Sequence, residues 1–171
     1  LDDALEVLPR IWAADGLAVD GPGYSSRSVT ALPRPWQRPH PPIWVGGNSP
    51  AAMRRAVDHA QGWSPFPTPD GVASAVRTSS ISNLDELGAA LRRAHERCDA
   101  IGRTEPLTIC FVPFSLQGYL HDPASGLGRL VEEVATLRSM GVDWVALSVP
   151  GLARSEIIER SAELAAALEL R

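Results

Sequence analysis

Four stretches of apolar residues, each followed by a segment with helical periodicity, occupy the chain from Ile43 onward. The stretches are short and mostly apolar, which is typical of strands in a parallel sheet covered by helices. The predicted strands are Ile43–Val45, Gly62–Phe66, Leu107–Phe114 and Asp143–Val149. Because short strand–helix connections place sequential strands side by side, the pattern predicts four adjacent parallel strands in that order.

Helices are predicted after each of these strands. Their expected bounds are Pro50 to about Ala60, Leu84–Ile101, about Gly126 to Met140, and about Ser155 to Leu170. Asn48 or Ser49 can cap the first helix, and Asn83 with Glu86 resembles a capping box before the second. A segment rich in proline, serine and threonine, Pro67–Ser82, separates the second strand from its helix and is expected to be a loop.

The residues before the first strand follow a different pattern. The apolar positions with helical spacing are Leu1, Leu5, Leu8, Ile11 and Trp12. Pro9 is expected to start, kink or end this helix. Gly21-Pro22-Gly23 predicts the turn of a hairpin. We therefore expect one domain over 1–171, in which 1–42 form a helix tail and a hairpin insertion and 43–171 form four βα units.

The composition is that of an ordinary globular protein, with 171 residues of which 44% are hydrophobic. A net charge of −4 argues against binding to nucleic acid or to anionic membranes, since both need clustered positive charge. No apolar run reaches membrane-spanning length, and no signal peptide opens the chain. Cys98 and Cys110 are too few for a disulfide framework, so a reducing, cytoplasmic location is expected.

All sixteen basic residues are arginines. This excludes a Schiff-base lysine and the lysine of a phosphate-binding P-loop. No metal-ligand spacing is present, so no metal site is predicted. The chain begins at Leu1 rather than at methionine, and we expect it to be a fragment or a processed piece.

The segment Gly46-Gly47-Asn48-Ser49 joins the first predicted strand to its helix. Glycines allow a ligand to approach the backbone closely, and a helix start offers free N–H groups at the positive end of its dipole. The segment could therefore bind a phosphate, with the Ser49 hydroxyl as a further donor. The alternative interpretation is that the glycines serve only the tight turn and Ser49 only the cap.

Other polar residues offer weaker candidates. The histidines interpreted as structural or solvated are His40, His59 and His95. His121 and Asp122 follow the third strand, where barrel enzymes place functional residues, but this dipeptide is also a common turn composition. Arg77 in the loop could reach an anionic ligand or remain solvated. No catalytic residue is assigned.

The stretch PRPWQRPHPPIWVGGNSPAAMRRAVDHAQGW resembles the region of bacterial-luciferase-like oxidoreductases that leads into their fifth barrel strand. Its Pro-Pro-Ile-Trp-Val-Gly-Gly run is similar to the branch that mostly uses the deazaflavin coenzyme F420. The segments GWSPFP, RTSSISNLDEL and GVDWVALSVPGLARSE are similar to the same branch.

This resemblance implies an α/β fold, namely the C-terminal half (strands five to eight) of a (β/α)8 TIM-type barrel. On it, Gly46, Gly47, Asn48 and Ser49 line the ribityl-phosphate part of the cofactor, whereas the absent first half supplies most ring contacts and the acid/base residues. The implied reaction is hydride transfer between reduced F420 and a small organic substrate. The alternatives are an FMN-dependent monooxygenase and a non-catalytic, self-assembling half-barrel. The implied partners are a small-molecule substrate and either further copies of the chain or the missing N-terminal half.

Overall fold

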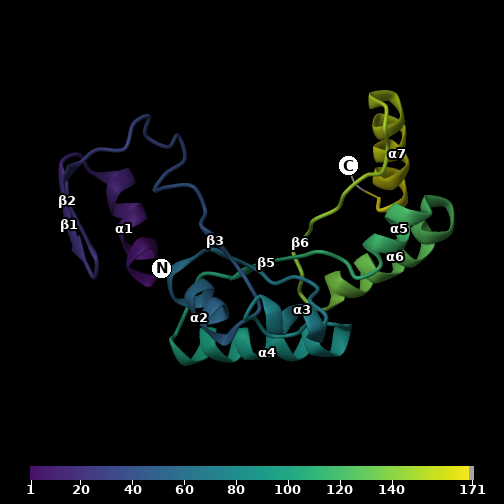
Figure 1. The fold of residues 1–171 in the computed structure, drawn as a ribbon, viewed down its shortest axis with the longest axis horizontal. Coiled ribbons are helices and arrows are strands. Elements are labelled where there is room, and N and C mark those ends of the chain that lie inside the picture. Colours follow the sequence, from purple (N-terminus) through teal and green to yellow (C-terminus); the bar gives the residue numbers. More distant parts are fainter. Residues whose placement is uncertain (170–171) are drawn as a thin grey trace.

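Four short parallel strands form the centre of the molecule in the computed structural model, which describes residues 1–169 (Figure 1). They are β3 (Trp44–Gly46), β4 (Gly62–Ser64), β5 (Thr108–Phe111) and β6 (Trp144–Val145). Their order in the sheet is β3-β4-β5-β6, and every neighbouring pair is parallel. The predicted sheet order and direction are confirmed. β3 has the predicted length but lies one residue later than predicted. The other three strands are shorter than predicted, because the chain leaves the ladder before the end of each apolar stretch.

A helix follows each strand, as predicted, and two of the helix starts have side-chain caps close to those expected. The four helices are α2 (Pro50–His59), α4 (Leu84–Ala100), α6 (Pro123–Ser139) and α7 (Arg154–Ala167). The Ser49 hydroxyl oxygen accepts a hydrogen bond from Ala52 N at 3.1 Å. Asn83 accepts one from Glu86 N at 2.9 Å. The Glu86 carboxylate reaches back to Ser82 N at 2.7 Å, one residue earlier than in the predicted capping box.

Two further helices were not predicted. They are α3 (Asp70–Ala75), inside the segment expected to be a loop, and α5 (Leu116–His121), directly after the third strand. Each has six residues, which is too few to show a helical repeat of apolar positions. The predicted end of the last helix, Leu170, lies outside the described residues.

The N-terminal part forms a helix and a hairpin, as expected. α1 (Asp2–Ala13) contains Pro9, which neither starts nor ends it. β1 (Leu17–Gly21) and β2 (Tyr24–Val29) pair antiparallel around Pro22-Gly23. A separate ion pair connects α1 to α2, because Arg55 Nε donates to Asp2 Oδ1 at 2.7 Å.

One face of the parallel sheet packs against α2 and α4. Trp63 and Phe111 are 1% and 0% exposed, and Val45 and Ile109 are buried beside them. The residues of α4 that complete this core are Leu87, Ala90, Leu91 and Ala94. Since side chains alternate along a strand, the remaining strand residues must point to the other face.

The opposite face of the sheet carries no helix in the described part of the chain (Figure 1). We call this uncovered face of the sheet the inner face. Trp44 and Trp144 lie on it, with ring centroids 6.3 Å apart and exposures of 40% and 62%. The indole of Trp44 lies over Gly62, where an added Cβ would come within 2.7 Å of the ring. β3 and β6 are the two edges of the sheet, and each lacks a neighbour on one side among the described residues.

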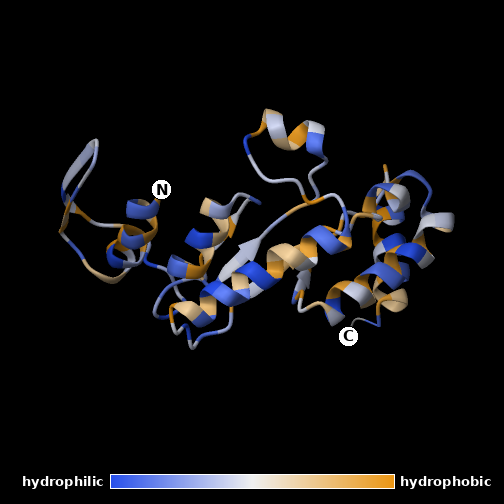
Figure 2. Ribbon diagram, turned by 90° about the horizontal axis from the view of Figure 1, so that it is seen from below, coloured by the Kyte–Doolittle hydropathy of each residue, from blue (hydrophilic) through white to orange (hydrophobic). Residues whose placement is uncertain are grey.

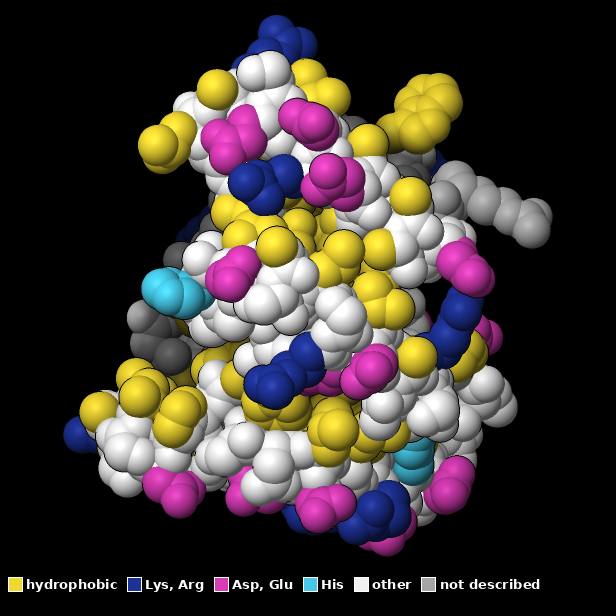
Figure 3. Space-filling model, turned by 90° about the vertical axis from the view of Figure 1, so that its right-hand side faces the viewer, with side chains coloured by type: hydrophobic (Ala, Val, Ile, Leu, Met, Phe, Trp, Pro, Cys, Tyr) yellow, Lys and Arg dark blue, Asp and Glu magenta, His cyan; other side chains and the backbone are white. Residues whose placement is uncertain are grey.

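The C-terminal helices build a second, smaller core. Its buried residues are Leu116, Tyr119, Leu130 and Leu164. Figure 3 shows this side of the molecule, where apolar side chains reach the surface between charged ones. Leu152, Ile157 and Ile158 are exposed around the start of α7. None of the helices in residues 1–169 is long and apolar enough to cross a membrane.

Replacing Asp58 by asparagine is expected to lower the free energy of unfolding by about 1 kcal/mol at pH 7. Arg97 Nε and Nη2 donate to the two carboxylate oxygens of Asp58 at 2.8 and 2.6 Å, joining α2 to α4. These hydrogen bonds hold the pKa of Asp58 below its ordinary value of 3.8. A lowered pKa stabilises the folded state above the unfolded pKa and loses this effect as the pH falls through the folded one.

Urea unfolding of both proteins from pH 7 down to about pH 2 checks this. The difference between wild type and Asp58→Asn should shrink below pH 3.8. A difference that stays constant over the whole range would contradict the assignment.

Candidate functional site

The four residues predicted to contact a cofactor, Gly46–Ser49, are the last residue of β3 and the three residues that join β3 to α2; we call them the turn. It lies at the carboxyl end of β3, the end at which parallel α/β sheets and barrels place their ligands. Gly47 has φ +113°, and a Cβ there would come within 3.1 Å of the Ala52 Cβ. A side chain at position 47 is therefore strained in this turn, whether or not a ligand binds.

Some backbone N–H groups at this turn donate hydrogen bonds to other parts of the chain, whereas others have no acceptor within the described residues. Gly47 N donates to Ser64 O at 3.3 Å, and Asn48 N donates to Thr78 Oγ1 at 3.1 Å. Within residues 1–169, the N–H groups of Ser49 and Ala51 have no acceptor. Both lie at the first turn of α2, where the helix dipole is positive. The start of α2 thus has two backbone N–H groups without an acceptor in the described part of the chain.

The side chain of Asn48 is buried, with 6% exposure. Its Nδ2 lies 2.8 Å from Phe66 O, 3.0 Å from Thr68 Oγ1 and 3.1 Å from Ser79 O. Its Oδ1 accepts from Phe66 N at 3.0 Å. The amide therefore ties the turn to the segment that follows β4.

The four predicted residues lie in one turn. The structure also shows the two roles of the alternative interpretation, in which the glycines form a tight turn and Ser49 caps the helix. Gly47 has the backbone conformation that a tight turn needs, and Ser49 caps α2. These roles are compatible with ligand binding, because the Ser49 hydroxyl accepts a bond as the cap and can still donate one. The cofactor role of Gly46–Ser49 remains a prediction.

His121 and Asp122 lie at the junction of α5 and α6. Asp122 is the N-cap of α6, and its Oδ1 accepts from Ser125 N at 3.3 Å. Hydrogen bonds from Ser125 lower the pKa of the Asp122 carboxyl. This pairing accounts for Asp122 as a helix cap, and His121 is exposed in the last turn of α5.

The other histidines lie on separate elements. His40 Nδ1 lies 2.8 Å from Pro41 O, and its ring packs at 5.7 Å from that of Trp12. His59 is in the last turn of α2, and His95 is in α4. Among the described residues, no group of three or more His, Cys, Asp or Glu side chains is placed to hold a metal ion.

The two cysteines are free thiols. Burial raises the pKa of both Cys98 and Cys110. A raised pKa keeps a thiol protonated at neutral pH, which is unfavourable for a nucleophile.

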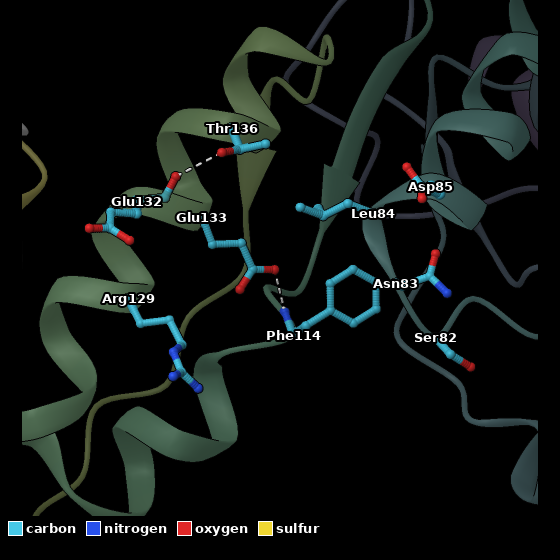
Figure 4. Close-up of a pocket in the computed structure, with 9 residues that line it drawn as sticks. All are labelled: Ser82, Asn83, Leu84, Asp85, Phe114, Arg129, Glu132, Glu133 and Thr136. Carbon is cyan, nitrogen blue, oxygen red and sulfur yellow. Dashed lines mark hydrogen bonds between the residues drawn. The ribbon is translucent and has the colours of Figure 1, made fainter.

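A pocket of about 670 Å3 lies between the start of α4 and the middle of α6 (Figure 4). Its lining includes the carboxylates of Asp85, Glu132 and Glu133 and a single guanidinium, that of Arg129. Glu133 accepts hydrogen bonds from the backbone N–H groups of Phe114, at 2.6 Å, and Ser115, at 2.7 Å. The pocket shares no residue with the Gly46–Ser49 turn, and its excess of carboxylates does not suit an anionic cofactor.

Sequence reasoning missed the partners that hold the turn. Thr68, Thr78 and Ser79 all belong to the segment expected to be a plain loop. Its richness in serine and threonine was the available signal, because these side chains bond readily to nearby backbone groups. Nothing in the sequence pattern indicated that the Glu133 carboxylate accepts hydrogen bonds from the backbone at the end of the third predicted strand.

Comparison with known proteins adds sequence relatives. The family model of luciferase-like monooxygenases matches residues 1–106. The FMNH2-dependent dimethylsulfone monooxygenase of Pseudomonas putida is 39% identical over 55 residues, which are 32% of this chain and 15% of that enzyme. The F420-dependent glucose-6-phosphate dehydrogenase of Microbacterium testaceum (strain StLB037) is 33% identical over 63 residues, 37% of this chain and 18% of that enzyme.

Solved structures share the fold. The monooxygenase RslO1 from Streptomyces bottropensis superimposes with a TM-score of 0.70 at 19% identity, over 98% of this chain and 59% of the other. An F420-dependent secondary alcohol dehydrogenase, in complex with an F420–acetone adduct, gives 0.61 at 10% identity, over 97% and 60%. This chain thus spans about 60% of these proteins and has the α/β fold of luciferase-like TIM-barrel enzymes, with four parallel strands. Because the family model covers more than half of its length, the chain belongs to the luciferase-like monooxygenase family.

Proposed function

We propose that the chain is the part of an F420- or flavin-dependent oxidoreductase that holds the phosphate end of the cofactor at Gly46, Gly47, Asn48 and Ser49. The observation that carries the proposal is the turn itself. Its two free N–H groups, at Ser49 and Ala51, lie at the first turn of a helix and at the carboxyl end of a parallel strand.

The residues of the turn fit a phosphate group. Gly46 has no side chain, and an added Cβ would find only Ser64 O, at 3.7 Å, within contact distance. A ligand can therefore approach the backbone beside Gly46 without displacing a side chain. Asn48 supports the turn from within the protein, and Ser49 adds a hydroxyl donor.

The reaction that we propose is hydride transfer between reduced F420 and a small organic substrate, and the cofactor supplies the hydride chemistry when bound. The F420-dependent relatives and the Pro-Pro-Ile-Trp-Val-Gly-Gly run support this choice. An FMN-dependent monooxygenase is the second candidate. The higher identity to the FMNH2-dependent enzyme and the higher TM-score to a monooxygenase favour it.

Replacing Gly46 by valine is expected to weaken cofactor binding at least about tenfold, since the branched side chain would occupy the space beside the turn. Position 46 suits this test better than position 47. The backbone at Gly46 does not require glycine, so the variant should fold, whereas any side chain at Gly47 strains the turn itself. Fluorescence titration of the chain with F420 and with FMN measures the affinity and also shows which cofactor is preferred.

Gly46→Ala is the matched control, because its smaller side chain should weaken binding less than valine does. Circular dichroism shows whether each variant is folded. If folded Gly46→Val binds both cofactors as tightly as the wild type does, the turn has only its structural role.

A further inference from the structure

The segment that joins β4 to α4 leaves the body of the protein and returns to it at nearly the same place. Thr68 and Ile81 pair as an antiparallel bridge, with N–O distances of 2.9 and 3.1 Å. Residues 69–78, which we call the α3 excursion, lie between these clasped ends. Figure 2 shows α3 standing apart from the sheet and from the larger helices.

Asn48 fastens the base of this excursion to the β3–α2 turn. The two hydrogens of Nδ2 are shared by three acceptors, Phe66 O, Thr68 Oγ1 and Ser79 O. Its Oδ1 accepts from Phe66 N, and its backbone N–H donates to Thr78 Oγ1. The donors of Asn48 are therefore used within the chain.

The buried amide of Asn48 connects two segments of the chain, one before the excursion and one after it. The segment before the excursion and the segment after it are both bonded to Asn48, which therefore holds the two ends together in addition to the Thr68–Ile81 bridge. Asn48 also lies between Gly47 and Ser49, so these hydrogen bonds connect the turn directly to both ends of the excursion.

We propose that Asn48 is a positioning residue that holds the α3 excursion beside the turn, so that the excursion forms one wall of the cofactor site. The statement that the excursion forms a wall of the cofactor site rests on the proposed function. The fastening rests only on the hydrogen bonds around Asn48.

Trypsin gives a direct measure of the fastening. The chain has no lysine, so trypsin cleaves only after arginines, and Arg77 is exposed at the end of the excursion. Thr78, the next residue, is held by Asn48 N. Because proteolysis follows the population of the locally open state, the cleavage rate after Arg77 reports how firmly the excursion is held.

Asn48→Asp has nearly the shape of the wild-type side chain but no N–H donors, and it places oxygen against the carbonyl oxygens of Phe66 and Ser79. We expect cleavage after Arg77 to become at least tenfold faster in this variant. Cleavage after Arg27, in the hairpin, provides the internal reference and should not change. Ser74→Ala is the matched control within α3, since it removes only a bond to Asp70 O.

Thr78→Val is a milder second variant in case Asn48→Asp fails to fold. It removes only the hydroxyl that Asn48 N contacts, and we expect a threefold or larger increase in cleavage after Arg77. If circular dichroism shows a folded protein and neither variant is cleaved faster than the wild type, the positioning role of Asn48 is wrong.

A second arm of the experiment adds FMN or F420 at millimolar concentration. Either cofactor should slow cleavage after Arg77 in the wild type, and the protection should be lost in Asn48→Asp. If the titration shows that a cofactor binds but neither cofactor protects the wild type, the excursion is not a wall of the site; if neither cofactor binds at all, the proposed function itself fails. The rates without cofactor still decide the fastening, so the two failures are distinguishable.

Discussion

Replacing Trp63 by alanine is expected to lower the free energy of unfolding by about 3–5 kcal/mol, the range for deleting a large buried aromatic side chain. Trp63 is 1% exposed between the sheet and its covering helices. Its Nε1 also donates to Gly47 O at 2.9 Å, so the variant loses a support of the candidate turn as well. Urea denaturation followed by circular dichroism measures the change.

Trp44→Ala is the matched control, because it removes the same side chain from the neighbouring strand on the other face of the sheet. Trp44 is 40% exposed, so its loss should cost the isolated chain much less than the loss of Trp63. Equal losses for the two variants would mean that the inner face is covered in solution.

The 171-residue chain is expected to self-associate at micromolar concentration rather than remain a stable monomer. Both edges of its parallel sheet are unpaired among the described residues, and Trp44 and Trp144 are exposed on the inner face. Open sheet edges invite pairing, and large exposed apolar patches are unusual on monomers. Association of two copies, or binding to further strands that complete a barrel, would cover this face.

Light scattering across a dilution series measures the association. The double variant Trp44→Ser, Trp144→Ser should weaken it at least about tenfold, because roughly 1 kcal/mol of apolar burial is lost at each position. A double variant of two exposed residues elsewhere, Leu32→Ser and Trp36→Ser, is the matched control. A compact wild-type monomer at micromolar concentration would contradict the half-barrel argument.

The cofactor titration and the association measurement together test whether the chain is a half-barrel that still binds a cofactor. If the chain binds F420 or FMN at the turn and also associates, a half-barrel that keeps part of its cofactor site is the consistent description. If it associates without binding either cofactor, the alternative of a non-catalytic, self-assembling half-barrel is favoured. The Gly46→Val titration and the dilution series together separate these outcomes.

Local patterns in the sequence were sufficient for the parallel sheet and for the helices that follow its strands. Ile43–Val45 is a short apolar run of the kind that forms buried strands. Leu87 and Leu91, both buried in α4, are spaced four residues apart as on one face of a helix. The caps at Ser49 and Asn83 were also predictable, because capping depends on a side chain and backbone groups only three residues away.

The tertiary structure alone decided what the residues of the candidate turn do. Asn48 looks like a ligand-binding residue in the sequence, but its amide bonds to Phe66, Thr68 and Ser79, which lie 18 to 31 positions further along the chain. The clamp of Glu133 on the chain after β5 likewise joins residues 18 and 19 positions apart. No local pattern encodes such contacts, because the fold brings these residues together only after the sheet has formed.

The same distinction applies to the tryptophans of the sheet. The sequence by itself determined that Trp44, Trp63 and Trp144 lie on strands, since each belongs to an apolar run of the right length. Only the tertiary structure decided that Trp63 is buried and that Trp44 and Trp144 are exposed. The physical reason is that alternation along a strand fixes which residues share a face, whereas the packing of α2 and α4 onto one face of the sheet fixes which face becomes the core.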